Sequence, residues 1–581
     1  MRLGRGGLAD TAKRLDSPRV ALLALASAWV HSTLAPWCLK AGLAAHARAA
    51  HTAAVIEGTV NETPEAVLAR VLEQRPDVLG VSCHIWNIAF VEALLPLVRR
   101  ALPGCVVVLG GPEASPRPGD ALAALPEADF VIVGEGEVAF AMLVDALCGM
   151  GSIGDVPGLV HRGMDSPRVP PAGGGLAVSP YTPEYAARLG GRIAYVETSR
   201  GCPFACAFCL SGGEGTRFLP LEEAYARILA AGAMGAHTLK FVDRTFNANP
   251  ARAKEILRFI LSRLGKDIPP HTVFHFEIAA DLLDEEAIHI VRESPAGLFR
   301  FEAGLQSLDE GVLRAAQRRT DTAKALRNLE ALIGTGKAHV HADLIAGLPG
   351  EGLEDFARGF DRAYLLRPHA LQLGFLKLLH GSAMRNDPAR FPCEFDPRPP
   401  YEVRRTPAMG EGDFAELKRA ALALDKLHNS GRFPRTLAFL TGEAGVRPYD
   451  LFAGIGKEME AHPRGAAMPL DALTGLLLDY SVALVPGEAA RLRDLMLMDR
   501  LCGVRTSVVP ECIKRPDTRM HAVKRALDRR FPRGEEIARS YGILCAGEER
   551  AVCVDYDAPD PVTGQYAANI VPLRELAGLH P

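Results

Sequence analysis

The sequence predicts an α/β protein in three parts: a doubly wound domain, a partial (β/α)6 barrel and a mainly helical C-terminal domain. Two series of short apolar segments alternate with helix-like stretches, and a segment rich in Pro and Gly separates the two series. The alternation stops near residue 390. Continuous Val, Leu and Ile runs bounded by Gly are typical of parallel strands that are covered on both faces.

We place the boundaries of these parts where the composition changes. The predicted parts are a flexible, basic arm over 1–16, the doubly wound domain over 17–150, a linker over 151–192, the partial barrel over 193–390 and the C-terminal domain over 391–581.

The first series contains five predicted strands. They are "VALLALASA" (20–28), "TAAVIEG" (52–58), "DVLGVSC" (77–83), "CVVVLGG" (105–111) and "DFVIVGEGE" (129–137). In an open sheet of this kind, a ligand binds beyond the carboxyl ends of the strands.

The second series contains six predicted strands, each followed by a helical pattern. They are "IAYVET" (193–198), "TLKFVD" (238–243), "TVFHFEI" (272–278), "FRFEAGLQS" (299–307), "VHADLIAG" (340–347) and "LQLGFLKLL" (371–379). Six such units with right-handed crossovers curve into an open barrel, whose chemistry lies at the carboxyl ends of its strands. The region after 391 reads as mainly helical, with a small strand-like end at 550–566.

Composition excludes several classes of function. The net charge of −3 gives no reason to expect nucleic acid as the main partner. No apolar run reaches the 18 residues that a membrane span requires, so we expect no membrane association. Twelve cysteines scattered over 581 residues do not resemble a disulfide framework, so we expect a reducing cytoplasm. We also expect a monomer.

The segment "TSRGCPFACAFCLSGG" (198–213) carries Cys202, Cys206 and Cys209 in the spacing C-x3-C-x2-C. Structural zinc takes four protein ligands, and no further Cys or His pair with suitable spacing completes this set. A catalytic disulfide needs only C-x-x-C. Three thiolates can hold a [4Fe–4S] cluster and leave one iron open. The spacing therefore predicts that this loop binds such a cluster.

"SRGCPFACAFC" resembles the signature of the radical S-adenosylmethionine (SAM) enzymes. The resemblance implies that the open iron binds SAM and that reductive cleavage gives a 5′-deoxyadenosyl radical. "FEAGLQSLDEGVLRAAQRR" (301–319) and "DLIAGLPGE" (343–351) resemble further segments of this family. Matching by motif implies SAM contacts at Glu277, Gln306, Arg318 and Asp343. Asp243, in "VDRTFNAN", is a further candidate for the methionine ammonium.

The first domain resembles the flavodoxin/Rossmann-like cobalamin-binding domain of B12-dependent radical SAM enzymes. The resemblance rests on "GVSCHIWNIAF" (80–90), "GGPEAS" (110–115) and "GEGE" (134–137). It implies cobalamin contacts at Ser82, Trp86, Asn87, Gly110, Gly111, Pro112, Glu113, Gly134, Glu135, Gly136 and Glu137.

The lower face of cobalt is predicted to lack a histidine ligand. The D-x-H-x-x-G motif that usually supplies one is absent from the sequence. Trp86 is the candidate to pack against this face, and His84 is the competing candidate for ligation.

The resemblance to radical SAM enzymes, combined with the resemblance to a cobalamin-binding domain, implies a C-methyltransferase. It would use the 5′-deoxyadenosyl radical and methylcobalamin on an unactivated carbon of a small-molecule or natural-product substrate. A low-potential donor such as flavodoxin or ferredoxin is expected to supply electrons. The alternatives are a B12-dependent rearrangement or cyclisation without methyl transfer, a methylthiotransferase, and a non-catalytic cobalamin sensor. The C-terminal domain is predicted to act as a lid or to bind substrate.

Overall fold

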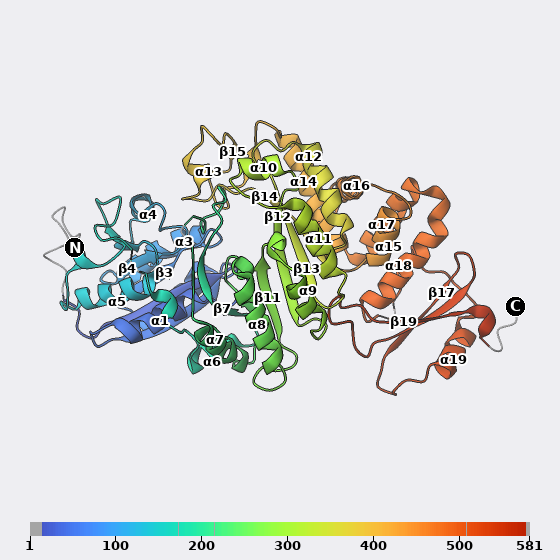
Figure 1. The fold of residues 1–581 in the computed structure, drawn as a ribbon, viewed down its shortest axis with the longest axis horizontal. Coiled ribbons are helices and arrows are strands. Elements are labelled where there is room, and N and C mark those ends of the chain that lie inside the picture. The colour runs from blue at the N-terminus through green and yellow to red at the C-terminus, as the bar shows by residue number, and fades with distance from the viewer. Residues whose placement is uncertain (1–13, 172, 214, 507, 577–581) are drawn as a thin grey trace. The chain divides into compact units, whose positions relative to one another are not determined.

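The five apolar segments of the first series and one further strand, β6, form a six-stranded sheet (Figure 1). The strand order is β2-β1-β3-β4-β5-β6. β1 pairs in parallel with both neighbours, so Val20 lies opposite Ala53 and Val78. β6 is antiparallel at the edge. Apart from β6, this is the flavodoxin-like order, in which the strand order reverses between β1 and β3. The computed structural model describes residues 14–171, 173–213, 215–506 and 508–576, so the expected arm over 1–16 lies largely outside the described residues.

The strands of this sheet are β1 (Arg19–Ala26), β2 (Thr52–Thr59), β3 (Val78–Ser82), β4 (Val106–Gly110), β5 (Phe130–Ile132) and β6 (Leu159–His161). The helices between them are α1 (Ala35–His46), α2 (Pro64–Gln74), α3 (Ile88–Ala101), α4 (Pro118–Ala124) and α5 (Gly136–Leu147).

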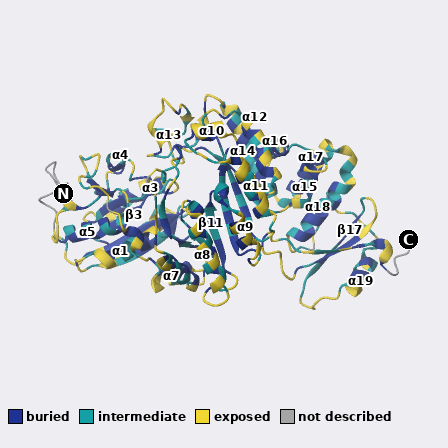
Figure 2. Cartoon of the chain, viewed as in Figure 1, coloured by how far each residue is buried: buried dark blue, intermediate teal, exposed yellow. Residues whose placement is uncertain are grey.

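The sheet is buried on both faces, as its continuous apolar runs predict. Ala21, Leu23 and Leu25 of β1 belong to one apolar cluster, whereas Val20 and Leu22 belong to another. Successive side chains of a strand point to opposite faces, so these two clusters are the cores on the two sides of the sheet. Figure 2 shows the buried strands between partly exposed helices.

The chain forms two compact units, which are described separately. The first contains residues 1–278, 316–318 and 377–403, and the second contains 279–315, 319–376 and 404–581.

The first unit continues past the doubly wound sheet into three strands of the second series. These strands, β7 (Ala194–Val196), β10 (Thr238–Phe241) and β11 (Val273–Ile278), pair in parallel. β8 (Ser199–Cys202) and β9 (Gly215–Phe218) form a hairpin. The remaining elements are α6 (Pro183–Leu189), α7 (Leu221–Ala233), α8 (Pro250–Arg263), α13 (Ala383–Asn386) and β15 (Glu394–Phe395).

The second unit opens with the other three strands of that series, also parallel. They are β12 (Phe299–Gln306), β13 (His339–Ala346) and β14 (Ala370–Phe375). Four helices lie before or between these strands in the sequence: α9 (Glu285–Arg292), α10 (Glu310–Ala315), α11 (Thr322–Ile333) and α12 (Leu353–Leu365). Asp284 and Asp321 cap α9 and α11 by accepting backbone N–H bonds, which fixes where these helices begin.

The C-terminal region is mainly helical and ends in a small antiparallel sheet. Its helices are α14 (Glu411–Leu424), α15 (Pro434–Thr441), α16 (Pro448–Ala461), α17 (Leu470–Leu484), α18 (Ala489–Gly503) and α19 (Met520–Arg530). The sheet contains β17 (Arg539–Leu544), β18 (Arg550–Asp555) and β19 (Ala568–Pro572). Separate apolar clusters form on its two faces, one with α18 and one with α19.

The predicted fold class is confirmed, and every predicted strand of both series is present. The segment expected to be a linker, 151–192, also contains β6 and α6. Among the described helices, none combines the length and the apolar character that crossing a bilayer would demand.

Candidate functional site

The three cysteines lie in the loop that β8 and β9 enclose. Cys202 ends β8, and Cys206 and Cys209 follow in the turn. Cys202 and Cys206 are buried, Cys209 is half-buried, and all three are free thiols. Gly201 precedes them at φ +93°, where a Cβ atom would lie 2.2 Å from the carbonyl oxygen of Gly215. Only glycine therefore fits this position of the loop.

Each thiol has a polar neighbour. The backbone N–H of Ser211 donates to Cys209 Sγ over 3.4 Å, and Arg318 Nη1 donates to Cys206 Sγ over 3.6 Å. Cys202 Sγ lies 3.6 Å from the Thr245 hydroxyl. Burial raises the pKa of Cys206, while the charge of Arg318 lowers it. These donors stabilise thiolates, which is the form that binds iron.

Arg200, two residues before Cys202, is held by three carboxylates. Its guanidinium lies 2.8 Å from Glu197, 2.9 Å from Glu137 and 3.3 Å from Glu135. Glu135 also pairs with Arg217 and accepts the N–H of Gly175, and the guanidinium groups hold its pKa low against the opposing effect of burial. The two acidic residues of the "GEGE" loop thus attach the first domain to the cysteine loop.

Asp243 supports the cysteine loop from the end of β10. It accepts hydrogen bonds from the backbone N–H of Thr198 (2.7 Å) and from the Thr198 hydroxyl (2.5 Å). Its carboxyl group is buried, and this burial raises its pKa. Glu277, on the neighbouring β11, lies 4.0 Å from Lys240. Direct contact of either residue with SAM stays a prediction.

Asn87 organises the loop after β3. Its amide accepts from the N–H of His84 (2.8 Å) and donates to the carbonyls of Ser82 (2.9 Å) and Leu25 (3.3 Å). Because Leu25 belongs to β1, these bonds fix the loop at the point where the strand order reverses.

Trp86 presents its ring at the same point. Its indole N–H donates to the Leu25 carbonyl over 3.0 Å, its ring stacks on His84 at 4.2 Å, and the residue is 48% exposed. Burial, with a smaller effect of Arg244, lowers the pKa of His84 to about 4. His84 is therefore neutral near pH 7, and Trp86 covers its ring.

The glycine loops after β4 and β5 have backbone geometry that other residues would strain. Gly111 has φ +97°, and a Cβ atom there would lie 2.6 Å from the Cys83 carbonyl oxygen. Gly134 has φ +82°. Gly110 ends β4, Pro112 is exposed, and Gly136 begins α5. A Cβ atom at Gly134 would lie 2.7 Å from Pro171 Cβ. The contacts of both loops with cobalamin stay predictions.

Glu113 has a structural partner that its local sequence does not reveal. It is buried, accepts the Tyr401 hydroxyl over 2.5 Å and pairs with Arg117 at 3.2 Å. His380 Nε2 also lies 3.7 Å from its carboxylate. Residues 377–403 thus return to the first domain through Glu113.

In the second unit, Gln306 has the features of a strained functional residue. It ends β12 with φ +68°, and the pairing register with β13 shifts between Gly304 and Gln306. Among the described residues, its buried amide oxygen has no hydrogen-bond partner. Strain of this kind and an unsatisfied buried oxygen commonly mark ligand sites.

Asp343 belongs to a cluster that sequence reasoning missed. His341 Nε2 lies 3.1 Å from Asp343 Oδ1, and Glu302 places a carboxylate oxygen within 4.8 Å of both residues' ligand atoms. His341 and Asp343 are two residues apart on β13, and Glu302 is the partner of His341 on β12. Alternating polar residues in "FRFEAGLQ" and "HVHADLIA" were the available signal.

Glu351 follows β13 in the "GLPGE" segment. It is 2% exposed and accepts the Ser307 hydroxyl over 2.5 Å. Burial raises its pKa to about 7, against the opposing hydrogen bond from Ser307. This pair connects the loops after β12 and β13, next to Gln306.

Family profiles match three consecutive parts of the chain. The B12 binding domain matches residues 30–144, the radical SAM superfamily matches 196–363, and a protein family of unknown function (DUF4080) matches 389–543.

Two curated relatives are similar over much of the chain. The 2-(S-pantetheinyl)-carbapenam-3-carboxylate methyltransferase of Streptantibioticus cattleyicolor is 27% identical over 62% of this chain and 58% of its own length. The cobalamin-dependent radical SAM methyltransferase TokK of Streptomyces tokunonensis is 27% identical over 67% of this chain and 62% of its own. The chain therefore spans about three fifths of these relatives.

A solved structure is similar in fold. The cobalamin-dependent S-adenosylmethionine radical enzyme OxsB, with aqua-cobalamin and S-adenosylmethionine bound, has a TM-score of 0.57 and 14% identity, over 82% of this chain and 80% of that one.

Proposed function

We propose that this chain, a cobalamin-dependent radical SAM protein, methylates an unactivated carbon of a small-molecule substrate. The observation that carries the proposal is the pairing of three free, hydrogen-bonded thiols in the radical SAM region with a B12-binding domain on the same chain. The similarity to two methyltransferases supports this reaction over a rearrangement or a cyclisation.

The thiol set fits a [4Fe–4S] cluster. Cys202, Cys206 and Cys209 would hold three irons as thiolates and leave the fourth for SAM. Arg318 and the Ser211 N–H donate to two of these sulfurs and offset part of the cluster's negative charge. Arg200 and Asp243 hold the segment that leads into this loop.

The proposed SAM contacts rest on the resemblance to radical SAM enzymes and on the charge and hydrogen bonding of individual side chains. Gln306 offers an unsatisfied amide oxygen to a hydroxyl or ammonium donor. Asp343 offers a carboxylate whose Oδ1 lies 3.1 Å from His341 Nε2. Arg318 supplies a cation for the methionine carboxylate, and Glu277 and Asp243 remain proposed contacts.

Cobalamin is proposed to bind at the carboxyl ends of β1, β3, β4 and β5. Together with the cluster and SAM, it would supply both hydrogen abstraction and a methyl donor. The residues of the chain would provide the cradle: Asn87 fixes the loop after β3, Trp86 would face the lower side of cobalamin, and Gly111 and Gly134 give the loops after β4 and β5 their left-handed backbone conformation.

The partners follow from the chemistry of these cofactors. A low-potential flavodoxin or ferredoxin is the proposed electron donor, and the protein is proposed to act as a monomer. Twelve free thiols and an oxygen-sensitive cluster require a reducing compartment, which supports a cytoplasmic location.

Anaerobic reconstitution tests the proposal. Wild-type protein should bind about four irons, bind one cobalamin, and convert SAM to 5′-deoxyadenosine under reduction. The triple variant Cys202→Ala/Cys206→Ala/Cys209→Ala should lose the iron and the deoxyadenosine but keep cobalamin. Cys393→Ala is the matched control and should behave as wild type. Iron retained by the triple variant would refute the assigned cluster site.

A further inference from the structure

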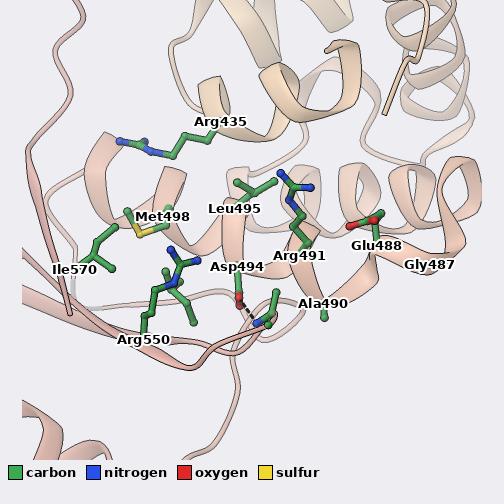
Figure 3. A pocket seen from close by; sticks show the side chains of 13 residues that line it. Arg435, Gly487, Glu488, Ala490, Arg491, Asp494, Leu495, Met498, Arg550 and Ile570 are labelled. Atoms are coloured by element: carbon green, nitrogen blue, oxygen red, sulfur yellow. Dashed lines mark hydrogen bonds between the residues drawn. The ribbon is translucent and has the colours of Figure 1, made fainter. Parts of the chain in front are cut away.

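The C-terminal region contains a pocket that none of the predicted site residues lines (Figure 3). Its volume is about 610 Å³, within the range of small-molecule sites. The lining comes from α15, the 3-10 turn before α18, α18 itself, the end of β17 and the turn after it, β18 and β19. It consists of Arg435, Gly487, Glu488, Ala490, Arg491, Asp494, Leu495, Met498, Leu544, Ala546, Gly547, Arg550 and Ile570.

Three guanidinium groups line this pocket, and they differ in how far their charge is already neutralised. Arg435 lies 3.4 Å from the buried carboxylate of Asp499, and Arg491 lies 2.5 Å from Glu443. Within the described part of the chain, the Arg550 side chain has neither an acidic partner nor a hydrogen bond. Arg550 is therefore the cation available to a ligand.

The acidic residues of the lining do not cancel this charge. Asp494 Oδ2 accepts the N–H groups of Cys545 (2.8 Å) and Ala546 (2.7 Å), and its Oδ1 lies 3.7 Å from Arg515. Glu488 lies on the opposite side of Arg491 from Arg550 (Figure 3). The part of the pocket beside Arg550 is consequently positive.

Apolar side chains complete the same part of the pocket. Met498 and Ile570 lie beside the two arginines, and Leu495 and Leu544 belong to the same lining (Figure 3). Ile570 is 42% exposed, and an apolar ligand group that covers it would remove this surface from water, which favours binding.

We propose that this pocket binds a small amphiphilic anion, with its phosphate or carboxylate group at Arg550 and its apolar group against Met498 and Ile570. Guanidinium groups recognise both anions through paired hydrogen bonds. The proposal goes beyond the proposed methyl transfer, because binding of such an anion depends on neither the cluster nor cobalamin.

Titration calorimetry of the full-length, reconstituted protein with n-octyl phosphate tests this site. One equivalent should bind, and Arg550→Met should weaken binding by about tenfold or more, the loss expected for a charge-assisted hydrogen bond. Arg491→Met removes a lining arginine whose charge Glu443 already neutralises, so it should weaken binding less than Arg550→Met does. Arg529→Met, an exposed arginine on α19, is the matched control and should bind as wild type.

Further probes measure separately how the anionic group and the apolar chain of the ligand contribute to binding. n-Octanol and inorganic phosphate should each bind more weakly than octyl phosphate, and comparison with octanoate decides whether phosphate or carboxylate is preferred. The proposal is overturned if octyl phosphate fails to bind, if Arg550→Met binds it as wild type does, or if octanol binds equally well.

Discussion

Gln306, Ser307 and Glu351 show how single residues determine the conformation of the loops that follow β12 and β13. Gln306 adopts a left-handed backbone conformation that glycine or asparagine favours. The next residue, Ser307, holds Glu351 in a buried hydrogen bond. The hydrogen bond between Ser307 and Glu351 thus holds the loop that carries Gln306. The stability of this loop depends on the Glu351 carboxyl group, which titrates near neutral pH.

The raised pKa of Glu351 predicts a pH-dependent stability. Its folded-state pKa of about 7 lies above the ordinary value of 4.5, so between these values the folded state keeps a proton that the unfolded state releases. Stability should therefore be full below pH 4.5 and fall as the pH rises toward 7, by at most about 3 kcal/mol. Glu351→Gln should remove this fall.

Thermal melts between pH 5 and 8 measure this effect. Glu330→Gln, at an exposed position of α11, serves as the control and should keep the wild-type pH dependence. A Glu351→Gln variant whose melting temperature falls with pH as steeply as the wild type would contradict the assignment.

At the scale of elements, the cysteine loop is held by residues far away in the sequence. Arg200 pairs with Glu135 in the loop after β5 and with Glu137 in the first turn of α5, and both lie more than sixty residues earlier. Since three carboxylates share this cation at low exposure, its removal leaves buried negative charge without compensation.

Arg200→Met should destabilise the cysteine loop by about 3–5 kcal/mol, the usual cost of breaking a buried ion pair. The iron content after reconstitution should fall, and hydrogen exchange should rise at 134–137 and 199–209. Arg217→Met removes only an exposed partner of Glu135 and should cost about 1 kcal/mol or less. Equal iron content and exchange in the two variants would exclude this role for Arg200.

The loop after β3 yields a prediction about cobalt. Because Trp86 covers the His84 ring and is anchored to β1, the bound cobalt(II) form should lack nitrogen superhyperfine splitting in paramagnetic resonance. Trp86→Ala should retain cobalamin but admit water to the lower face. Splitting in the wild type that disappears in His84→Ala would show that His84 is a ligand.

At the scale of the whole molecule, local patterns predicted the fold class and the strands of both series, and the spacing of three cysteines predicted the candidate cluster site. These features depend on short-range signals: apolar runs, glycines at strand ends and a fixed cysteine spacing. The pairing of Tyr401 with Glu113 could not be predicted, because 288 positions separate the two residues. The cluster of Glu302 with His341 depends on the register of two strands, which the sequence alone does not specify.

The proposed methyl transfer is tested most directly by following the methyl group of SAM. A small-molecule extract of the source organism, reductant and SAM with a deuterated methyl group would be incubated with the reconstituted protein and analysed by mass spectrometry. We predict a product that carries the labelled methyl on carbon and is absent with Cys209→Ala, together with S-adenosylhomocysteine and 5′-deoxyadenosine in comparable amounts. A new product that forms with 5′-deoxyadenosine but contains no label would contradict methyl transfer and favour rearrangement or cyclisation.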